Sequence, residues 1–215
     1  MSKSTSSPPD KPKLILAVDL GGSLTKVFYY DNSDNLKVLV MEPLTADVSE
    51  AELKNHLQQV VGNPEPEDVA WVKVADTSLP SEGNGDSPPP DKPKVSYKFK
   101  AVGRLAKYFG GTASLRKAKF ELGLFKILVA IGVARLKLKL PPKLAVAVCI
   151  LQPWGEYKNR NQLKEMLSDY SSFWFNGEKL SVSWWLFDFK PEGAGLGILR
   201  GKQVGLLLGN GIQLC

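Results

Sequence analysis

The residues best suited to do chemistry lie near the amino terminus, in the run Asp19-Leu-Gly-Gly-Ser-Leu-Thr-Lys26. Gly21 and Gly22 lack side chains, so the backbone there can approach an anion closely and direct several N–H groups toward it. Ser23 and Thr25 add hydroxyl donors to this backbone. The run is therefore a candidate phosphate-binding turn.

Charged residues stand at both ends of the turn. Lys26 adds a positive charge one residue into the following strand, and Asp19 is placed to hold a Mg²⁺ ion through water. The next residues, Val27–Tyr30, are strand formers, whereas a dinucleotide-binding loop or a P-loop needs a helix directly after its glycines. The run is equally compatible with a plain hairpin turn, in which Asp19 only caps the turn and Lys26 is a solvated charge.

The elements that must hold this turn are three predicted strands at residues 14–20, 24–30 and 36–41, which form an antiparallel meander. Ser49 and Glu52 form a capping box and predict a helix that begins there. The apolar run Leu144–Leu151 is typical of a strand buried on both faces, and we expect it to pair parallel to the first strand.

The remaining pattern places further elements along the chain. Strands are predicted at 69–74, 95–99, 180–187 and 204–208, and helices from Thr112 or Ser114 to about 134 and from 159 to 167. Residues 191–195 predict a turn or the start of a helix. The order predicts an α/β fold whose mixed sheet begins with the antiparallel meander and continues with parallel strands, with helices on both faces.

The run Asp19–Lys26 resembles a known motif. Asp-x-Gly-Gly-Ser/Thr-x-x-Lys at the first hairpin is similar to the phosphate-1 motif of the actin, heat-shock chaperone and sugar kinase superfamily, and most similar to that of prokaryotic actin-like proteins of the plasmid-segregation (ParM) type. The likeness covers most of residues 14–205. Ala-Val-Gly-Arg-Leu-Ala within Tyr97–Ala106 resembles the small subdomain insert, and Pro191-Glu-Gly-Ala-Gly195 resembles the segment after the last core strand. The resemblance implies a ribonuclease H-like, actin-type ATPase lobe.

The resemblance also implies roles for single residues, with ATP and Mg²⁺ as cofactors. Asp19 would lie near the metal ion, and Lys26 would touch a phosphate. Glu192 falls where the family places an acid or amide that orients the attacking water, a catalytic role, although the helix dipole alone favours a glutamate at a helix start. Backbone amides of four residues would wrap the β- and γ-phosphates: Gly21, Gly22, Ser23 and Leu24.

Two departures from the family pattern bear on function. The second Asp-x-Gly hairpin, expected near residues 204–212, is replaced by Val204-Gly-Leu-Leu-Leu-Gly-Asn-Gly211 without an aspartate, and no second lobe with an adenine-binding glycine pair follows. We therefore expect an actin-like amino-terminal lobe that binds ATP and forms filaments in plasmid or DNA segregation, but is incomplete as an ATPase by itself. Self-association or a separate second-lobe chain would complete the site, and nucleic acid or a DNA-bound adaptor is a further candidate partner.

Charge is distributed unevenly along the chain. Residues 92–143 hold fourteen Lys and Arg against one acid, Glu121, and thus carry +13 in a chain whose net charge is +6. Aromatic residues stand among these cations: Tyr97, Phe99, Tyr108, Phe109 and Phe120. The pattern supports an alternative function, a binding module for nucleic acid or an acidic partner, in which the rings stack on single strands. A solvated subdomain surface explains the charge equally well.

A ribonuclease H-like nuclease is a lower-ranked alternative, because it shares the meander-and-helix lobe. Such an enzyme needs several carboxylates that converge on metal ions, and Asp19, Asp188 and Glu192 are the candidates. The chain has two cysteines and one histidine. This composition excludes a cysteine zinc site and a disulfide framework, and it weakens a Ser-His-Asp hydrolase.

The expected organisation is a disordered tail at residues 1–13, a lobe at 14–205 with a small inserted subdomain at about 62–110, and a C-terminal end at 206–215. Within the insert, residues 76–94 hold five prolines and predict a flexible loop. The longest apolar stretch, Ile127–Ala134, is far shorter than the ~20 residues that cross a bilayer. We therefore expect a soluble cytoplasmic protein without a membrane partner.

Overall fold

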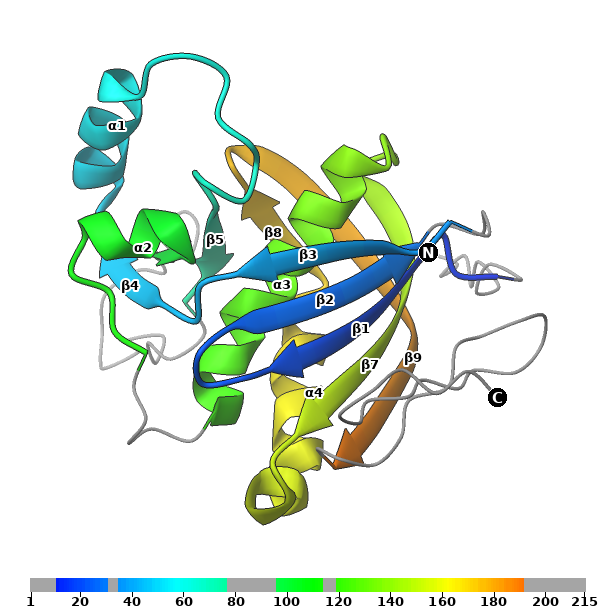
Figure 1. The fold of residues 1–215 in the computed structure, drawn as a ribbon. Coiled ribbons are helices and arrows are strands. Elements are labelled where there is room, and N and C mark those ends of the chain that lie inside the picture. The colour runs from blue at the N-terminus through cyan, green and yellow to red at the C-terminus, as the bar shows by residue number, and fades with distance from the viewer. Residues whose placement is uncertain (1–10, 31–34, 77–95, 114–118, 192–215) are drawn as a thin grey trace, which may run out of the picture.

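The computed structural model describes residues 11–30, 35–76, 96–113 and 119–191, in which nine strands form one mixed sheet (Figure 1). The strands are β1 (Leu14–Leu20), β2 (Thr25–Tyr30), β3 (Lys37–Met41), β4 (Thr45–Val48), β5 (Trp71–Ala75), β6 (Tyr97–Val102), β7 (Lys143–Gln152), β8 (Ser172–Phe175) and β9 (Glu178–Pro191). The helices are α1 (Glu50–Gln59), α2 (Arg104–Tyr108), α3 (Lys119–Lys137), α4 (Arg160–Asp169) and a 3-10 helix η1 (Trp154–Asn159). No helix in these ranges is long and apolar enough to cross a membrane.

The sheet has the spatial order β3-β2-β1-β7-β9-β8-β5-β6-β4. Strands β1, β2 and β3 form the predicted antiparallel meander, and β1 has the bounds expected from the sequence. Strand β7 pairs parallel to β1, with Asp19 opposite Leu151, so the expected parallel pairing is confirmed. Strand β9 continues parallel beyond β7. The mixed character of the sheet therefore follows the prediction.

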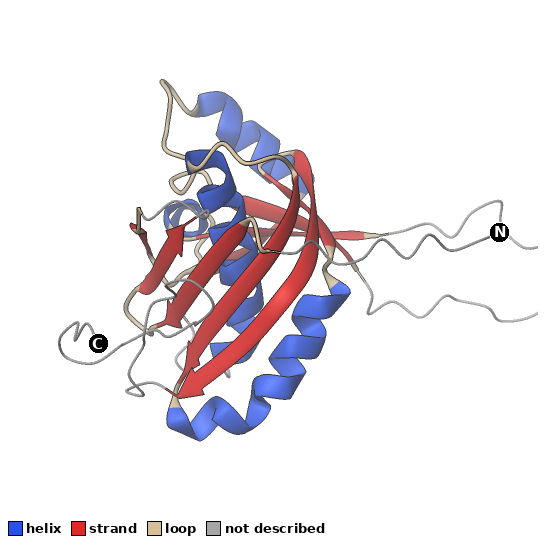
Figure 2. Ribbon diagram, turned by 90° about the vertical axis from the view of Figure 1, so that its right-hand side faces the viewer, coloured by secondary structure: helices blue, strands red, loops and turns tan. Residues whose placement is uncertain are grey.

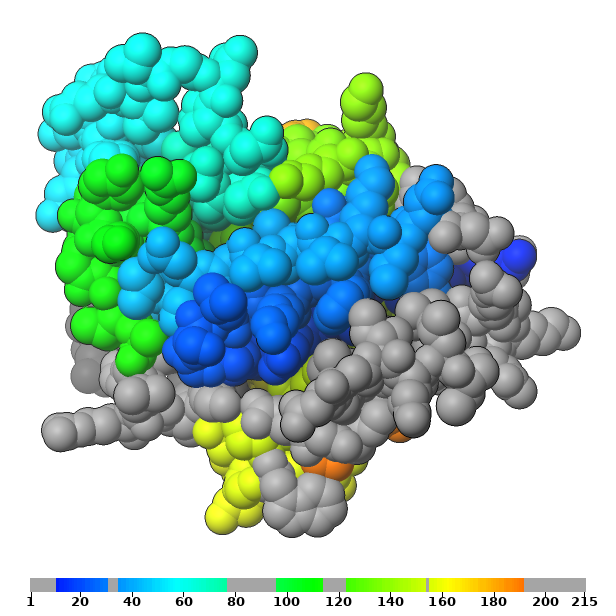
Figure 3. All heavy atoms as spheres, viewed as in Figure 1, coloured from blue at the N-terminus to red at the C-terminus, as the bar shows by residue number. Residues whose placement is uncertain are grey.

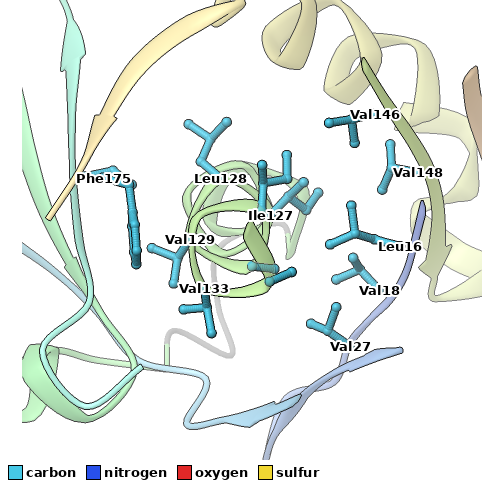
Figure 4. Close-up of a cluster of buried hydrophobic side chains, with 14 of the residues drawn as sticks. Leu16, Val18, Val27, Ile127, Leu128, Val129, Val133, Val146, Val148 and Phe175 are labelled. Carbon is cyan, nitrogen blue, oxygen red and sulfur yellow. The ribbon is translucent and has the colours of Figure 1, made fainter. Parts of the chain in front are cut away.

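Helix α3 fills the concave side of this curved sheet (Figure 2). Leu124, Ile127, Leu128 and Ile131 are at most 1% exposed. Figure 4 shows side chains directed toward the helix from two sides, with Phe175 of β8 on one side and Leu16 of β1 on the other. A helix that is apolar around most of its circumference is stable only when it is buried. Helix α4 contacts α3 on the same side of the sheet.

A second, smaller core lies on the opposite face of β4, β6 and β5. Leu53 of α1 and Leu105 of α2 pack there against Ala46 and Ala101. Helix α1 begins with the predicted capping box: the Ser49 hydroxyl accepts from the Glu52 N–H at 3.2 Å, and the Glu52 carboxylate accepts from the Ser49 N–H at 2.9 Å. The region expected as an inserted subdomain, at about 62–110, includes β5 and β6, which are part of the main sheet.

Although the strand predicted at 180–187 lies within β9, strands β8 and β4 are absent from the predicted elements, and so is the β8–β9 hairpin. Asn176 and Gly177 form its two-residue turn with positive φ angles of 46° and 88°. An Asn-Gly pair is the preferred sequence for this turn because both positions need a positive φ. The Asn176 side chain also accepts a hydrogen bond from the Trp71 N–H at 3.0 Å, which holds the turn against β5.

Several predicted boundaries differ from the structure. Helix α3 continues to Lys137 instead of ending near residue 134, and β9 runs through Pro191, where a turn was expected. Thr112 pairs with Thr45 in an isolated bridge and does not cap α3, while Ser114 lies outside the described residues. The predicted disordered tail is too long, because Pro12 is buried and the Lys13 N–H donates to the Ala145 carbonyl at 2.8 Å.

Three further expectations fall on other residues that the structure does not describe. They are most of the flexible loop at 76–94, the strand at 204–208 and the C-terminal end at 206–215.

Packing of α3 against β8 generates a stability prediction at Gly132. A Cβ atom there would overlap the Phe175 ring, 2.6 Å from its Cδ2. We expect Gly132→Ala to lower the free energy of unfolding by about 1–2 kcal/mol, because overpacking outweighs the gain in helix propensity. Urea denaturation would measure the change. Gly155→Ala is the control, since no described atom lies within 4 Å of its added Cβ; equal stability of both variants would contradict the predicted packing.

Candidate functional site

The predicted phosphate-binding turn lies between β1 and β2, at the carboxyl end of β1. Leu20 and Thr25 form the last cross-strand pair before the turn, which therefore consists of residues 21–24. Because β1 and β7 are parallel, the carboxyl ends of both strands lie at the same edge of the sheet. Ligands of open α/β sheets bind outside this edge. Figure 3 shows the end of the β1–β2 hairpin at the molecular surface, beside α2.

The turn requires glycine at position 21, because the backbone of Leu24 approaches Gly21 so closely that a side chain would not fit. A Cβ at this position would lie 2.5 Å from the Leu24 carbonyl oxygen, which is rigid backbone and cannot move aside cheaply. Ser23 is exposed, and the Leu24 side chain is 39% exposed. The turn therefore lies at the surface, where an anion site must lie.

Asp19 and Lys26 are direct cross-strand partners at the base of the turn. Lys26 is exposed and Asp19 is half-buried, on the sheet face opposite α3. Opposite charges at directly paired positions stabilise an antiparallel pair. Thr25 points the other way: its hydroxyl oxygen is buried on the α3 side and has no hydrogen-bond partner among the described residues.

Helix α3 approaches the same edge of the sheet. A Cβ on Gly123 would lie 2.6 Å from Leu20 Cδ1, so the amino-terminal part of α3 packs against the end of β1. The amino-terminal end of a helix carries a partial positive charge, which favours an anion nearby. The contact with Leu20 places this part of α3 close to the end of β1.

Two buried polar side chains that the sequence analysis did not select lie near this edge. Gln152 is the last residue of β7 and is 1% exposed, yet neither side-chain amide atom has a hydrogen-bond partner in the described ranges. Glu156, in η1, has a buried carboxylate oxygen that also lacks a partner there. Their sequence signal was their position directly after a strand predicted to be buried and parallel to β1. Buried polar groups without partners are costly, so both are candidates to face a ligand.

The structure brings Asp19–Lys26 together in one hairpin, whereas Glu192 lies outside the described residues. Asp188, the remaining acid of the nuclease alternative, lies opposite Cys149 and forms an ion pair with Lys190 at 3.3 Å. Within the described ranges, no three His, Cys, Asp or Glu residues are grouped so that they could hold a metal ion.

Part of the charge of the basic segment 92–143 is neutralised by acids from other parts of the chain. Five of its described cations form ion pairs with acids outside the segment: Lys98–Asp76, Lys100–Asp47, Arg104–Asp68, Arg135–Glu178, and Lys137 with Glu65 and Glu67. Lys126, on α3, is buried. These five cations are therefore occupied by acids of the same chain, which weakens the support for this segment as a nucleic-acid site.

The antiparallel meander, the parallel strands β7 and β9, and the central helix define the fold of one lobe of a ParM-like actin-type protein. The chain is similar to Bacillus thuringiensis ParM with AMPPNP, at 19% identity and a TM-score of 0.54, over 86% of this chain and 46% of that one. It is also similar to Bacillus thuringiensis ParM with ATP, at 18% identity and a TM-score of 0.52, over 85% of this chain and 46% of that one. The apo psk41 ParM protein is similar at 13% identity and a TM-score of 0.53, over 83% of this chain and 49% of that one.

The chain thus spans about half the length of the solved structures that it matches. No family model matches the sequence, and no curated protein matches it. At these identities the comparisons establish the fold of the lobe.

Burial of the Cys149 thiol beside Asp188 leads to a reactivity prediction. Desolvation first, and the nearby Asp188 carboxylate second, raise the pKa of this thiol to about 12. Because the thiolate is the reactive form, Cys149 stays protonated and unreactive at pH 8 in the folded protein. In a Cys215→Ser variant, a disulfide reagent should therefore react slowly with native protein and rapidly with urea-unfolded protein. Equal rates in the two states would contradict the described burial.

Proposed function

We propose that the β1–β2 turn binds the phosphates of ATP together with Mg²⁺, and that the chain acts as one lobe of an actin-like, nucleotide-dependent assembly. The observation that carries this proposal is the glycine turn at the carboxyl edge of the parallel strands, with Asp19 and Lys26 paired at its base. The similar Bacillus thuringiensis ParM proteins are described with ATP and with AMPPNP, and this supports a nucleotide as the ligand.

The residues of the turn fit a magnesium-bound triphosphate. Backbone N–H groups of residues 21–24 would donate to phosphate oxygens, and the exposed Lys26 ammonium would neutralise part of their charge. Asp19 would hold Mg²⁺ through water, a ligand arrangement that this ion prefers. The bound metal would supply charge neutralisation for phosphoryl transfer to water.

Orientation of the attacking water is the remaining requirement of hydrolysis. Gln152 and Glu156 are suited to it because they have buried polar atoms near the same edge, without a hydrogen-bond partner in the described part of the chain. Glu192 remains a third candidate for this task, on the motif resemblance alone. In the proposal, Gln152, Glu156 and Glu192 affect the rate of ATP hydrolysis. Asp19 and the turn affect the affinity for ATP.

One lobe forms only one wall of an actin-type nucleotide cleft. A nucleotide bound to the turn alone would stay largely in water, where electrostatic stabilisation of a transition state is weak. We therefore propose that self-association or another chain closes the site and that nucleotide binding is coupled to this assembly. A role in plasmid or DNA segregation belongs to this proposal.

The direct test is calorimetric titration of the full chain with ATP, with and without Mg²⁺. We expect Mg²⁺-dependent binding that Asp19→Ala and Gly21→Ala abolish, since the first loses the metal partner and the second distorts the turn. Asp169→Ala and Gly155→Ala are the controls, because both positions are exposed and lie outside the turn. Wild-type protein that binds no ATP, or binding that survives both turn substitutions, would contradict the proposal.

Turnover gives a separate prediction. We expect the isolated chain to release phosphate from ATP slowly or not at all, and Glu156→Gln and Glu192→Ala to leave ATP affinity within about twofold, because neither residue is assigned to ground-state binding. A phosphate-release assay beside the titration separates the two effects. Rapid turnover by the monomeric wild type would contradict the single-wall argument.

A further inference from the structure

Strands β5, β6, β8 and β9, which include no residue of the β1–β2 turn, carry a row of alternating aromatic and cationic side chains. Phe99 on β6 pairs with Lys73 on β5, Lys73 pairs with Trp174 on β8, and Trp174 pairs with Lys179 on β9. Directly paired residues present their side chains on the same face. These four residues therefore form one row across four neighbouring strands, called here the aromatic–lysine row.

The row lies on the outer face of the sheet, opposite α3. Its neighbours along the strands, Val72 and Phe175, are paired with each other and belong to the core around α3. Successive residues of a strand point to opposite faces, so Lys73 and Trp174 point away from that core. Lys179 is exposed, and Lys73 and Trp174 are half-buried.

The lysines and rings are in contact with one another. The Lys73 ammonium lies 4.3 Å from the centroid of the Tyr97 ring, 5.3 Å from that of Phe99 and 5.2 Å from that of Trp174. The Lys179 ammonium lies 5.2 Å from the Trp174 ring, and Tyr97 packs edge-on to Trp174 with 5.4 Å between centroids. Tyr97 is 39% exposed. These are cation–π distances at a partly solvated surface.

Within the described strands, no neighbouring carboxylate neutralises the row. The one acid within β5, β8 and residues 178–183 of β9 is Glu178, which faces α3 and pairs with Arg135. Glu50 of α1 interacts with Lys73 at longer range, but its carboxylate binds Lys54 at 2.8 Å. Among the described residues, Lys73 and Lys179 are in no ion pair. The row is thus a cationic, aromatic strip.

Because Phe99 packs into the second core beneath α1 and α2, the accessible part of this face is formed by Tyr97, β5, β8 and β9. We propose that this part binds single-stranded nucleic acid. Lys73 and Lys179 would exchange their ring contacts for phosphates, and Tyr97 and Trp174 would then offer ring surface to unpaired bases. The hydroxyls of Ser172 and Ser181, which are exposed and paired in the next row, would donate to the backbone. An acidic peptide would satisfy the lysines but leave the rings unused. The proposal uses no residue of the nucleotide site and is independent of the proposed ATPase-type function.

The test is fluorescence anisotropy of a labelled oligothymidylate of about 20 nucleotides with the full chain, starting near 50 mM salt. We expect Lys73→Gln/Lys179→Gln to weaken binding at least tenfold and to reduce the slope of log K against log salt by about 1.4, because each lysine–phosphate pair that is removed accounts for about 0.7. Lys107→Gln/Lys158→Gln is the matched control, because it removes the same charge from exposed positions elsewhere. It should change the affinity less than twofold.

Tyr97→Leu separates stacking from charge. We expect it to weaken binding severalfold while the salt slope stays unchanged, and circular dichroism would verify the fold of each variant. Three results would overturn the proposal: no binding by the wild type, equal weakening in the lysine variant and its control, or tighter binding of poly-glutamate or duplex DNA than of the single strand. Loss of ATP binding without loss of oligonucleotide binding would contradict only the proposed nucleotide site.

Discussion

Helix α3 lies inside the curve of the nine-stranded sheet, and its burial holds together segments that are far apart in the chain. The helix is apolar on most sides, so it is stable only when strands from both ends of the sheet cover it. Strands β1 and β2 pack on one side of it, and Phe175 of β8 packs on another (Figure 4). Since α3 also packs on Leu20, this burial positions the end of β1 and the turn after it. The burial of α3 therefore both forms the core and positions the candidate site.

Part of this arrangement could be predicted from local pattern. Strand β1, the capping box at Ser49 and the parallel pairing of β7 all have short-range signals, and the structure confirms them. Strand β4 lacked such a signal, because it has only four residues and its pairing partner β6 comes about fifty residues later in the chain. The β8–β9 hairpin did have one, the pair Asn176-Gly177.

Charge was harder to interpret than the backbone. The basic residues of 92–143 are concentrated in sequence, but β6, α2 and α3 bring five of them to acids that stand before and after this segment. Their neutralisation depends on tertiary contacts, which no local pattern contains. The same holds for the candidate site. The turn could be predicted from the sequence, whereas Gln152 and Glu156 become candidates only because the structure buries their polar atoms without hydrogen-bond partners among the described residues. By contrast, Lys73 and Lys179 lie outside the basic segment and have no ion-pair partner among the described residues.

The central claim is that the backbone of the β1–β2 turn binds nucleotide phosphates. Amide hydrogen exchange at residues 21–24 measures this directly, because donation to a phosphate protects an exposed N–H from solvent. With Mg²⁺ and ATP present, the amides of these four residues should exchange more slowly, and in Asp19→Ala the nucleotide should have no such effect. Unchanged exchange in this turn at an ATP concentration that saturates binding would show that the nucleotide binds elsewhere and would contradict the account.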